Sequence, residues 1–331
     1  MLDINPSSVR QWSRLGSRAM FGQSILALAE NLSNLMVLSA DLGKSSGLDR
    51  FAAAYPEQFI NTGIAEQNMI GVAAGLAKEG FVPFATSFAP FIAMRACEQI
   101  RMNMGYMQMN VKAVAIGSGL AMGFLGNSHY GTEDLAVIRS IPNLTVIAPA
   151  DCAEILKVVY AAAAHEGPVY IRLTGSINTP IVYSADYDFS IGQAIQLRTG
   201  TDVSIIAHGS MVHEALLAAK LLEEKNVSVS VWNMHTVKPL DGNALEQCYS
   251  HSKLVVTVEE HSVIGGLGSA VAEHRSLYAA APPLLRLGLP DQYGVTADYR
   301  YLLEYYGLVG SGIGSAVLSF LDGSKTNTVL S

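Results

Sequence analysis

Short apolar runs of strand length alternate with helical segments along most of this 331-residue chain, and this alternation limits the fold more than any other feature. Residues 35–42, 111–117 and 144–151 each have the length of a buried strand and carry few charges. A segment with the apolar spacing of a helix follows each of these runs. Strands that alternate with helices form parallel sheets covered on both faces. The sequence therefore predicts an α/β fold.

The alternation stops once, in the middle of the chain. Residues 175–201 hold turn formers and scattered charges, and we expect a linker at about residues 180–192. A second alternating series follows, which agrees with the roughly 100–200 residues of an ordinary domain. The sequence predicts two three-layer domains with parallel sheets, at residues 14–185 and residues 190–325.

The composition excludes several classes of protein. Hydrophobic residues make up 50% of the chain, charged residues only 15%, and the mean hydropathy is +0.28. A surface so poor in charge suggests large subunit interfaces. The net charge of −7 and the pI of about 5.6 argue against nucleic acid or an anionic membrane as partner.

The cysteines and the termini suggest a reducing compartment. Cys97, Cys152 and Cys248 lie far apart and form no CxxC pair, so they predict neither a disulfide framework nor a zinc site. The N-terminus has no apolar core of signal-peptide type. Residues 113–132 carry no formal charge and are long enough to span a bilayer, but their five glycines favour a loop-rich site. We therefore expect a cytoplasmic protein without a membrane segment.

The sequence contains no complete phosphate-binding motif. LGKSS at residues 42–46 ends like a P-loop, but the position of the first glycine is occupied by Leu38. GSGLAMG at residues 117–123 has a displaced third glycine, and no acid ends a second strand about 20 residues later. HExxH is absent, and GKSSG at residues 43–47, which has the letters of GxSxG, lies in a predicted loop and not on the tight strand-to-helix turn of a serine hydrolase. The motifs thus give no support to nucleotide, zinc or serine hydrolysis.

Residues 61–77, NTGIAEQNMIGVAAGLA, predict a helix of unusual composition. Small residues such as Gly71, Ala74 and Gly75 would allow close approach of another backbone, and apolar residues almost all round predict a buried helix. Glu66 lies in its first turn. By position alone, an acid there complements the helix dipole and needs no further role.

The order of motifs around this helix resembles a known family. Residues 61–91 and residues 119–151 (GLAMGFLGNSHYGTEDLAVIRSIPNLTVIAPAD) resemble the pyrimidine-binding domain of transketolases and 1-deoxyxylulose-5-phosphate synthases. Residues 259–273 (EEHSVIGGLGSAVAE) and residues 288–308 resemble the transketolase C-terminal domain. The resemblance extends over about residues 16–323, nearly the whole chain.

The resemblance implies a thiamine diphosphate site. Glu66 would hydrogen-bond a ring nitrogen of the pyrimidine and stabilise the imino tautomer that takes the proton from the thiazolium carbon. Phe88 and Phe91 match the positions that stack on the pyrimidine, although both could be ordinary core residues. Asp41 is assigned to the cofactor site by its family spacing. A third aromatic of the family is replaced by Met94.

The resemblance also implies a substrate site. His129 would steady the oxygen of the bound carbonyl, although a loop histidine can simply bond to the backbone. The family's Asp four residues earlier is Leu125 here, and a second family histidine falls at Gly117, so the sequence does not identify the sugar pair. Three further residues match positions that hold the substrate phosphate, with an interface salt bridge as the alternative for each: Arg18, Ser45 and Arg172.

One domain of the family is not found in this sequence. Full-length transketolases carry an earlier domain whose Gly-Asp-Gly motif and downstream Asn hold the metal and the diphosphate. The chain has no GDG, and too few residues precede position 18 for such a domain. We therefore expect a split transketolase: a separate N-terminal subunit would hold Mg²⁺ or Ca²⁺ with the diphosphate, in an α2β2 heterotetramer.

The expected reaction is transfer of a two-carbon ketol unit from a ketose phosphate to an aldose phosphate. The β-subunit of a 2-oxoacid dehydrogenase shares the two-domain layout and stays open, as does a decarboxylating synthase. A non-catalytic scaffold subunit is a further alternative, because fold alone does not fix function.

Overall fold

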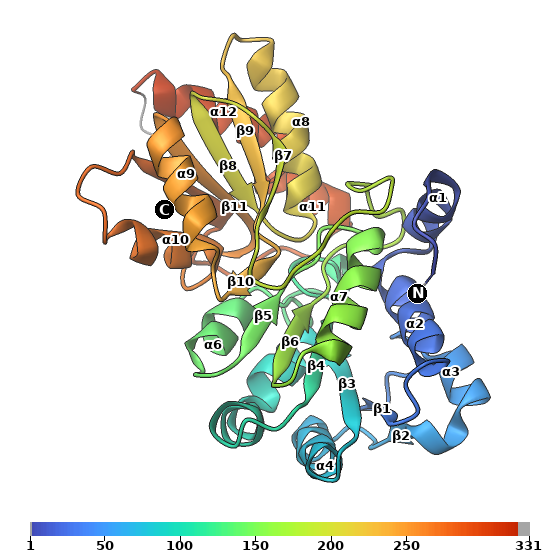
Figure 1. Ribbon diagram of the computed structural model, residues 1–331. Coiled ribbons are helices and arrows are strands. Elements are labelled where there is room, and N and C mark those ends of the chain that lie inside the picture. Colours follow the sequence, from blue (N-terminus) through green and yellow to red (C-terminus); the bar gives the residue numbers. More distant parts are fainter. Residues whose placement is uncertain (1, 324–331) are drawn as a thin grey trace.

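The computed structural model describes residues 2–323 and contains two α/β units (Figure 1). Each unit is a mostly parallel sheet with helices on both faces, so the predicted fold class is confirmed. Each sheet also has one antiparallel edge strand that the sequence did not predict. Within residues 2–323 no helix is long and apolar enough to cross a membrane.

The first unit is built on a seven-stranded sheet with the order β10-β5-β6-β4-β3-β1-β2. Alternate residues of its strands enter two separate cores: Val37 packs with the α2 and α7 side, and Leu38 with the α4 side. This period of two explains why the strands are apolar on both faces. The elements of this unit are α1 (Pro6–Leu15), α2 (Ser17–Ala29), β1 (Leu35–Ser39), α3 (Asp49–Ala54), β2 (Phe59–Asn61), α4 (Glu66–Lys78), β3 (Val82–Phe88), α5 (Cys97–Gln99), β4 (Lys112–Ile116), α6 (Asp134–Ser140), β5 (Thr145–Ile147), α7 (Cys152–Ala164) and β6 (Val169–Arg172).

The second unit has a five-stranded sheet with the order β12-β11-β8-β9-β7. Ile205 packs on the side of α8 and α12, whereas Ile206 packs on the side of α9 and α10, so this sheet too is the middle of three layers. Its elements, with β10 of the first sheet, are β7 (Ile195–Arg198), β8 (Val203–Ala207), α8 (Met211–Glu223), β9 (Val229–Asn233), β10 (Thr236–Lys238), α9 (Gly242–His251), β11 (Leu254–Ser262), α10 (Leu267–Arg275), β12 (Leu284–Leu289), α11 (Tyr299–Tyr305) and α12 (Gly310–Leu321).

Strand β10 joins the two units. It belongs to the second half of the chain, yet Thr236 pairs antiparallel with Ile147 of β5 and extends the first sheet. In Figure 1 this strand lies at the boundary between the two sheets, next to β5. A strand from the second half of the chain therefore forms one edge of the first sheet.

Most of residues 91–106 form a helical segment of an unusual kind. Phe91–Arg95 and Ile100–Tyr106 are π-helical, with the short α5 between them. The amide of Ala96 donates to the Phe91 carbonyl at 3.3 Å, five residues back, which widens the turn. Such turns are rare and often lie at functional sites. This wider turn brings Arg95 above the Phe91 ring, as described below.

Candidate active site

Glu66 is a buried carboxylate with a charged partner. It begins α4 and its side chain is 1% exposed. One guanidinium nitrogen of Arg95, Nη1, donates to both carboxylate oxygens at 2.8 Å, and the Ser87 hydroxyl donates at 3.4 Å. A buried carboxylate must find donors of this kind, because an unpaired buried charge is costly. The sequence did not identify Arg95 as this partner.

Two phenylalanines and a histidine form a cluster next to this ion pair. Phe88 ends β3, and Phe91 follows in the first π-helical turn. The ring centroids of Phe88 and Phe91 are 6.0 Å apart, and the His129 ring lies 5.8 Å and 5.2 Å from them in edge-to-face geometry. The guanidinium carbon of Arg95 lies 4.3 Å from the Phe91 centroid. The structure thus brings together Glu66 and these three rings.

His129 is carried by a glycine-rich loop that is tied back on itself. Gly119 and Gly131 exchange backbone hydrogen bonds of 2.8 and 3.0 Å, which closes the loop. Gly119 has a φ of +66°, and a Cβ atom there would lie 2.3 Å from the Glu260 carboxylate, so only glycine fits. The His129 Nδ1 atom lies 3.0 Å from the Ser128 hydroxyl. This leaves Nε2 of the ring for another partner.

Gly117 and Leu125 are the two positions near this loop at which the sequence differs from the family pattern. At Gly117, a Cβ atom would meet Met122 at 2.8 Å and Phe88 at 3.3 Å, so Met122 fills the space of a side chain there. Leu125 is exposed, as is Met94 at 48%. Both apolar side chains are therefore accessible at the surface of the subunit.

Arg18 and Ser45 lie together in a second site. They line a cavity of about 250 Å³ between the start of α2 and the loop after β1. Arg18 donates to the Ser45 carbonyl at 3.4 Å, and burial lowers the pKa of its guanidinium from the ordinary value. Lys44 lines the same cavity and was not singled out from the sequence. Two cations and a hydroxyl in one cavity are suited to an anionic group.

Asp41 lies at the start of the same loop. It is exposed, and its backbone has a φ of +57°. Its amide donates to the Asn61 side chain at 3.1 Å, and its carboxylate accepts from Asn61 at 3.2 Å. This reciprocal pair ties the loop after β1 to the end of β2, and the structure contains no further partner for the Asp41 carboxylate among residues 2–323.

Arg172 does not lie with Arg18 and Ser45. Its side chain is 0% exposed and lies at the junction of the two units. Its Nε atom donates to both oxygens of Asp134 at 3.0 Å, and its Nη2 atom donates to the carbonyls of Gly131 and Glu260 at 2.9 Å. Its Nη1 atom has no hydrogen-bond partner among residues 2–323, and Asp134 neutralises the charge inside the chain, so the phosphate contact of Arg172 stays a prediction and this placement favours a structural role.

The helix α4 also corrects a prediction. Met69 and Ala73 are buried as expected, but Gln67, Gly71 and Gly75 are exposed along one side. A Cβ atom at Gly71 or Gly75 would meet nothing within 4 Å. The helix is therefore covered on one side only in the single chain, although its composition is that of a helix covered all round.

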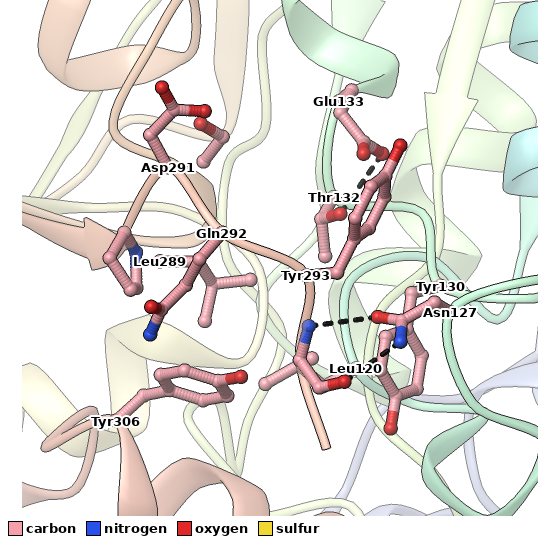
Figure 2. A pocket seen from close by; sticks show the side chains of 13 residues that line it. Leu120, Asn127, Tyr130, Thr132, Glu133, Leu289, Asp291, Gln292, Tyr293 and Tyr306 are labelled. Carbon is pink, nitrogen blue, oxygen red and sulfur yellow. Dashed lines mark hydrogen bonds between the residues drawn. The ribbon is translucent and has the colours of Figure 1, made fainter. Parts of the chain in front are cut away.

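A separate cavity of about 270 Å³ lies between the glycine-rich loop and the segment after β12 (Figure 2). Asn127 and Gly294 exchange hydrogen bonds of 2.8 and 2.9 Å across its wall. The hydroxyl of Tyr130 donates at 2.8 Å to the Val295 carbonyl. None of the lining residues is Glu66, Phe91 or His129, so this cavity is distinct from the aromatic cluster. The hydrogen bonds in its wall join the loop to the second unit.

Comparison with protein-family models gives a direct match over both units. The transketolase pyrimidine-binding domain matches residues 14–178, and the transketolase C-terminal domain matches residues 192–322. The chain belongs to the transketolase family. Dependence on thiamine diphosphate is a property of this family, and the buried acid with its aromatic neighbours in the pyrimidine-binding domain suits the ring of that cofactor.

Three relatives of this transketolase chain are named as a section or a subunit of a transketolase. A protein of Methanocaldococcus jannaschii, provisionally named a transketolase C-terminal section, is 43% identical over 92% of this chain and 95% of its own length. A 6-deoxy-6-sulfo-D-fructose transketolase subunit from Clostridium is 41% identical over 87% of this chain and 89% of its own length. An apulose-4-phosphate transketolase subunit of Phocaeicola vulgatus is 35% identical over 93% of this chain and 98% of its own length. The chain is thus a C-terminal subunit of the split-transketolase type.

Solved structures agree with this assignment. A split-gene transketolase described as an inactive β4 tetramer superposes with a TM-score of 0.82 at 43% identity, over 92% of this chain and 97% of that one. A transketolase of Pichia stipitis has a TM-score of 0.78 at 19% identity, a similarity that shows the fold alone; this chain spans 48% of its length.

1-Deoxy-D-xylulose-5-phosphate synthase of Parasynechococcus marenigrum is a sequence relative that is 36% identical but is matched over only 42% of its length.

Proposed function

We propose that this subunit forms half of the active site of a transketolase that moves a two-carbon ketol unit from a ketose to an aldose. The observation that carries the proposal is the buried Glu66 carboxylate beside the Phe91 ring, with the intervening Arg95 in contact with both. A buried acid and an aromatic face are the two features needed to hold a planar nitrogen heterocycle.

Each residue of the cluster has a role in this proposal. Phe88 and Phe91 provide apolar faces for the pyrimidine ring, and Glu66 holds a proton at a ring nitrogen. Thiamine diphosphate, when bound, supplies the electron sink for breaking the carbon–carbon bond. His129 donates from Nε2 to the carbonyl oxygen of the substrate in the tautomer whose Nδ1 accepts from the Ser128 hydroxyl. Asp41 orders the adjacent loop through Asn61.

The diphosphate end belongs to a partner in this proposal. Among residues 2–323 no group of three or more His, Cys, Asp or Glu side chains could hold a metal ion. A separately encoded N-terminal subunit would hold Mg²⁺ or Ca²⁺ and the diphosphate, in an α2β2 heterotetramer. The exposed side of α4, with Gly71 and Gly75, supports such an interface because it lets a second backbone approach closely. The inactive tetramer of a 43% identical relative agrees with a need for a second subunit.

The substrates proposed here end in an anionic group. Arg18, Lys44 and Ser45 would hold that group in their shared cavity. Two relatives are named for sugars with a sulfonate or a phosphate, which supports this class of substrate. A decarboxylating synthase is a weaker candidate, because its relatives match over about half their length.

Co-expression with an N-terminal transketolase subunit tests the proposal. The complex is expected to bind thiamine diphosphate with Mg²⁺ in calorimetry and to transfer ketol units between phosphorylated sugars. Turnover of pyruvate in place of a ketose would favour the synthase, and a complex that binds no cofactor would leave only the scaffold function.

Glu66→Gln tests the acid itself. The variant is expected to assemble normally and to lose at least about 100-fold in turnover, since proton placement of this kind contributes roughly 10²–10⁴-fold. Glu79→Gln, at the exposed end of the same helix, is the matched control and should retain full activity. Unchanged turnover in Glu66→Gln would contradict the proposed role.

A further inference from the structure

Arg95 occupies the space between the two groups proposed to hold the cofactor ring. Its Nη1 atom is 2.8 Å from both Glu66 oxygens, and its guanidinium carbon is 4.3 Å from the Phe91 centroid. A ring stacked on Phe91 would lie at about the same distance from the Phe91 ring as this guanidinium does, since stacked carbon atoms approach to roughly 3.5–4.0 Å. A planar guanidinium and a planar heterocycle that bonds to Glu66 therefore require the same place.

We propose that Arg95 takes the place of the pyrimidine ring in the cofactor-free subunit and must rotate away before thiamine diphosphate binds. Arg95 would thereby act as a positioning residue that holds Glu66 in place and sets the affinity for the cofactor. This inference rests on the proposed function, because it takes Glu66 and Phe91 as the groups that hold the ring.

The surroundings of Arg95 allow this movement. Its side chain is 46% exposed, and within residues 2–323 the Glu66 carboxylate is the only hydrogen-bond acceptor of its guanidinium. Rotation into solvent therefore breaks one ion pair and one cation–π contact and buries no charge. Arg172 shows the contrast: its side chain is 0% exposed and bonds to Asp134 and two backbone carbonyls, so it cannot leave its site.

Glu66 has a partner in both states. Its side chain is 1% exposed, so removal of Arg95 without a replacement would leave a buried carboxylate with only the long hydrogen bond from Ser87. A ring nitrogen that shares a proton with Glu66 provides the replacement donor. Cofactor binding then replaces the Arg95 donor of Glu66 by a donor on the ring. The free energy needed to break the Arg95–Glu66 ion pair therefore weakens the binding of the cofactor.

The wide turn of the π-helix explains how Arg95 reaches this place. Arg95 is the last residue of Phe91–Arg95, four positions after the ring on which it lies. Arg101, six positions later, points to solvent instead and pairs with the exposed Glu98. These two arginines of the same helical segment thus form a matched pair, one in the proposed cofactor place and one outside it.

Arg95→Ala in the co-expressed complex tests the inference. The dissociation constant for thiamine diphosphate, measured by calorimetry with Mg²⁺, is expected to fall about 3- to 10-fold, because the competing ion pair is gone. Arg95→Lys, which keeps the charge near Glu66, should bind close to the parent value. Arg101→Ala should match the parent.

A second readout separates competition from a structural role. Without cofactor, the Arg95→Ala complex should melt below the parent, since Glu66 is left unpaired. Saturating cofactor should remove most of this difference, so the cofactor-induced rise in Tm should be larger in the variant. Weaker binding by Arg95→Ala, or an unchanged dissociation constant, would overturn the inference. Absence of binding by the parent complex would overturn the proposed function instead.

Discussion

Replacement of Arg172 by methionine should destabilise the subunit strongly and leave any selectivity for phosphorylated substrates unchanged. Arg172 and Asp134 are both fully buried, and the arginine also bonds to the carbonyls of Gly131 and Glu260. Methionine retains much of the volume, but it leaves Asp134 with the hydroxyl of Tyr170 at 2.9 Å as its nearest side-chain donor. Breaking a buried pair on one side costs about 3–5 kcal/mol.

Urea unfolding of the isolated subunit measures this loss. Arg139→Met is the matched control: Arg139 also joins the two units, through Glu273, but that pair is at the surface, where the glutamate is 64% exposed. Its loss should cost no more than about 1 kcal/mol. The structural role of Arg172 would be wrong if Arg172→Met unfolded at the same urea concentration as the parent. The phosphate role would be supported if the complex also lost activity on phosphorylated substrates only.

Two further predictions concern the anionic cavity and the exposed side of α4. Arg18→Ala and Lys44→Ala should each raise KM for phosphorylated sugars roughly tenfold or more, because a charge-assisted hydrogen bond contributes about 1.5–3 kcal/mol; an equal effect on unphosphorylated sugars would remove the residue from the site. Gly71→Leu should leave the isolated subunit as stable as the parent or slightly more so, since no atom lies within 4 Å of an added Cβ. The same variant should block assembly with the N-terminal subunit in size-exclusion chromatography, while Gly71→Ala should assemble far better; a normal complex of Gly71→Leu would place the interface elsewhere.

The sequence predicted the layers of the fold because burial on both faces leaves a strong apolar signal. The start of α7 is equally local: the side chain of Asp151, directly before the helix, accepts from the Glu154 amide at 2.9 Å. Strands β2 and β7 were missed because they are short edge strands that are only partly buried, so their sequences lack the continuous apolar run of a central strand.

The candidate site was predictable in part. Phe88, Phe91 and Glu66 come together as the resemblance implied, whereas Arg95 was not predicted, since a π-helical turn changes which residues face each other and leaves no periodic signal. The surroundings of Arg172 were not predicted, for a different reason. Its position at the end of a strand suggested the ligand edge, but its partners, Asp134 and Glu260, come from distant segments whose proximity only the folded chain reveals.

The pairing of β10 with β5 determines the order in which this protein can complete its folding. During synthesis the first sheet remains open at β5 until residues 236–238 have left the ribosome, by which time the strands of the second sheet up to β9 have been made. An open sheet edge is a template for pairing with other chains. A fragment that ends at the linker should therefore aggregate, because its β5 edge is unpaired. A fragment that extends through β10 should not, because β10 covers that edge. The first unit thus depends on a strand that is synthesised later, within the second half of the chain.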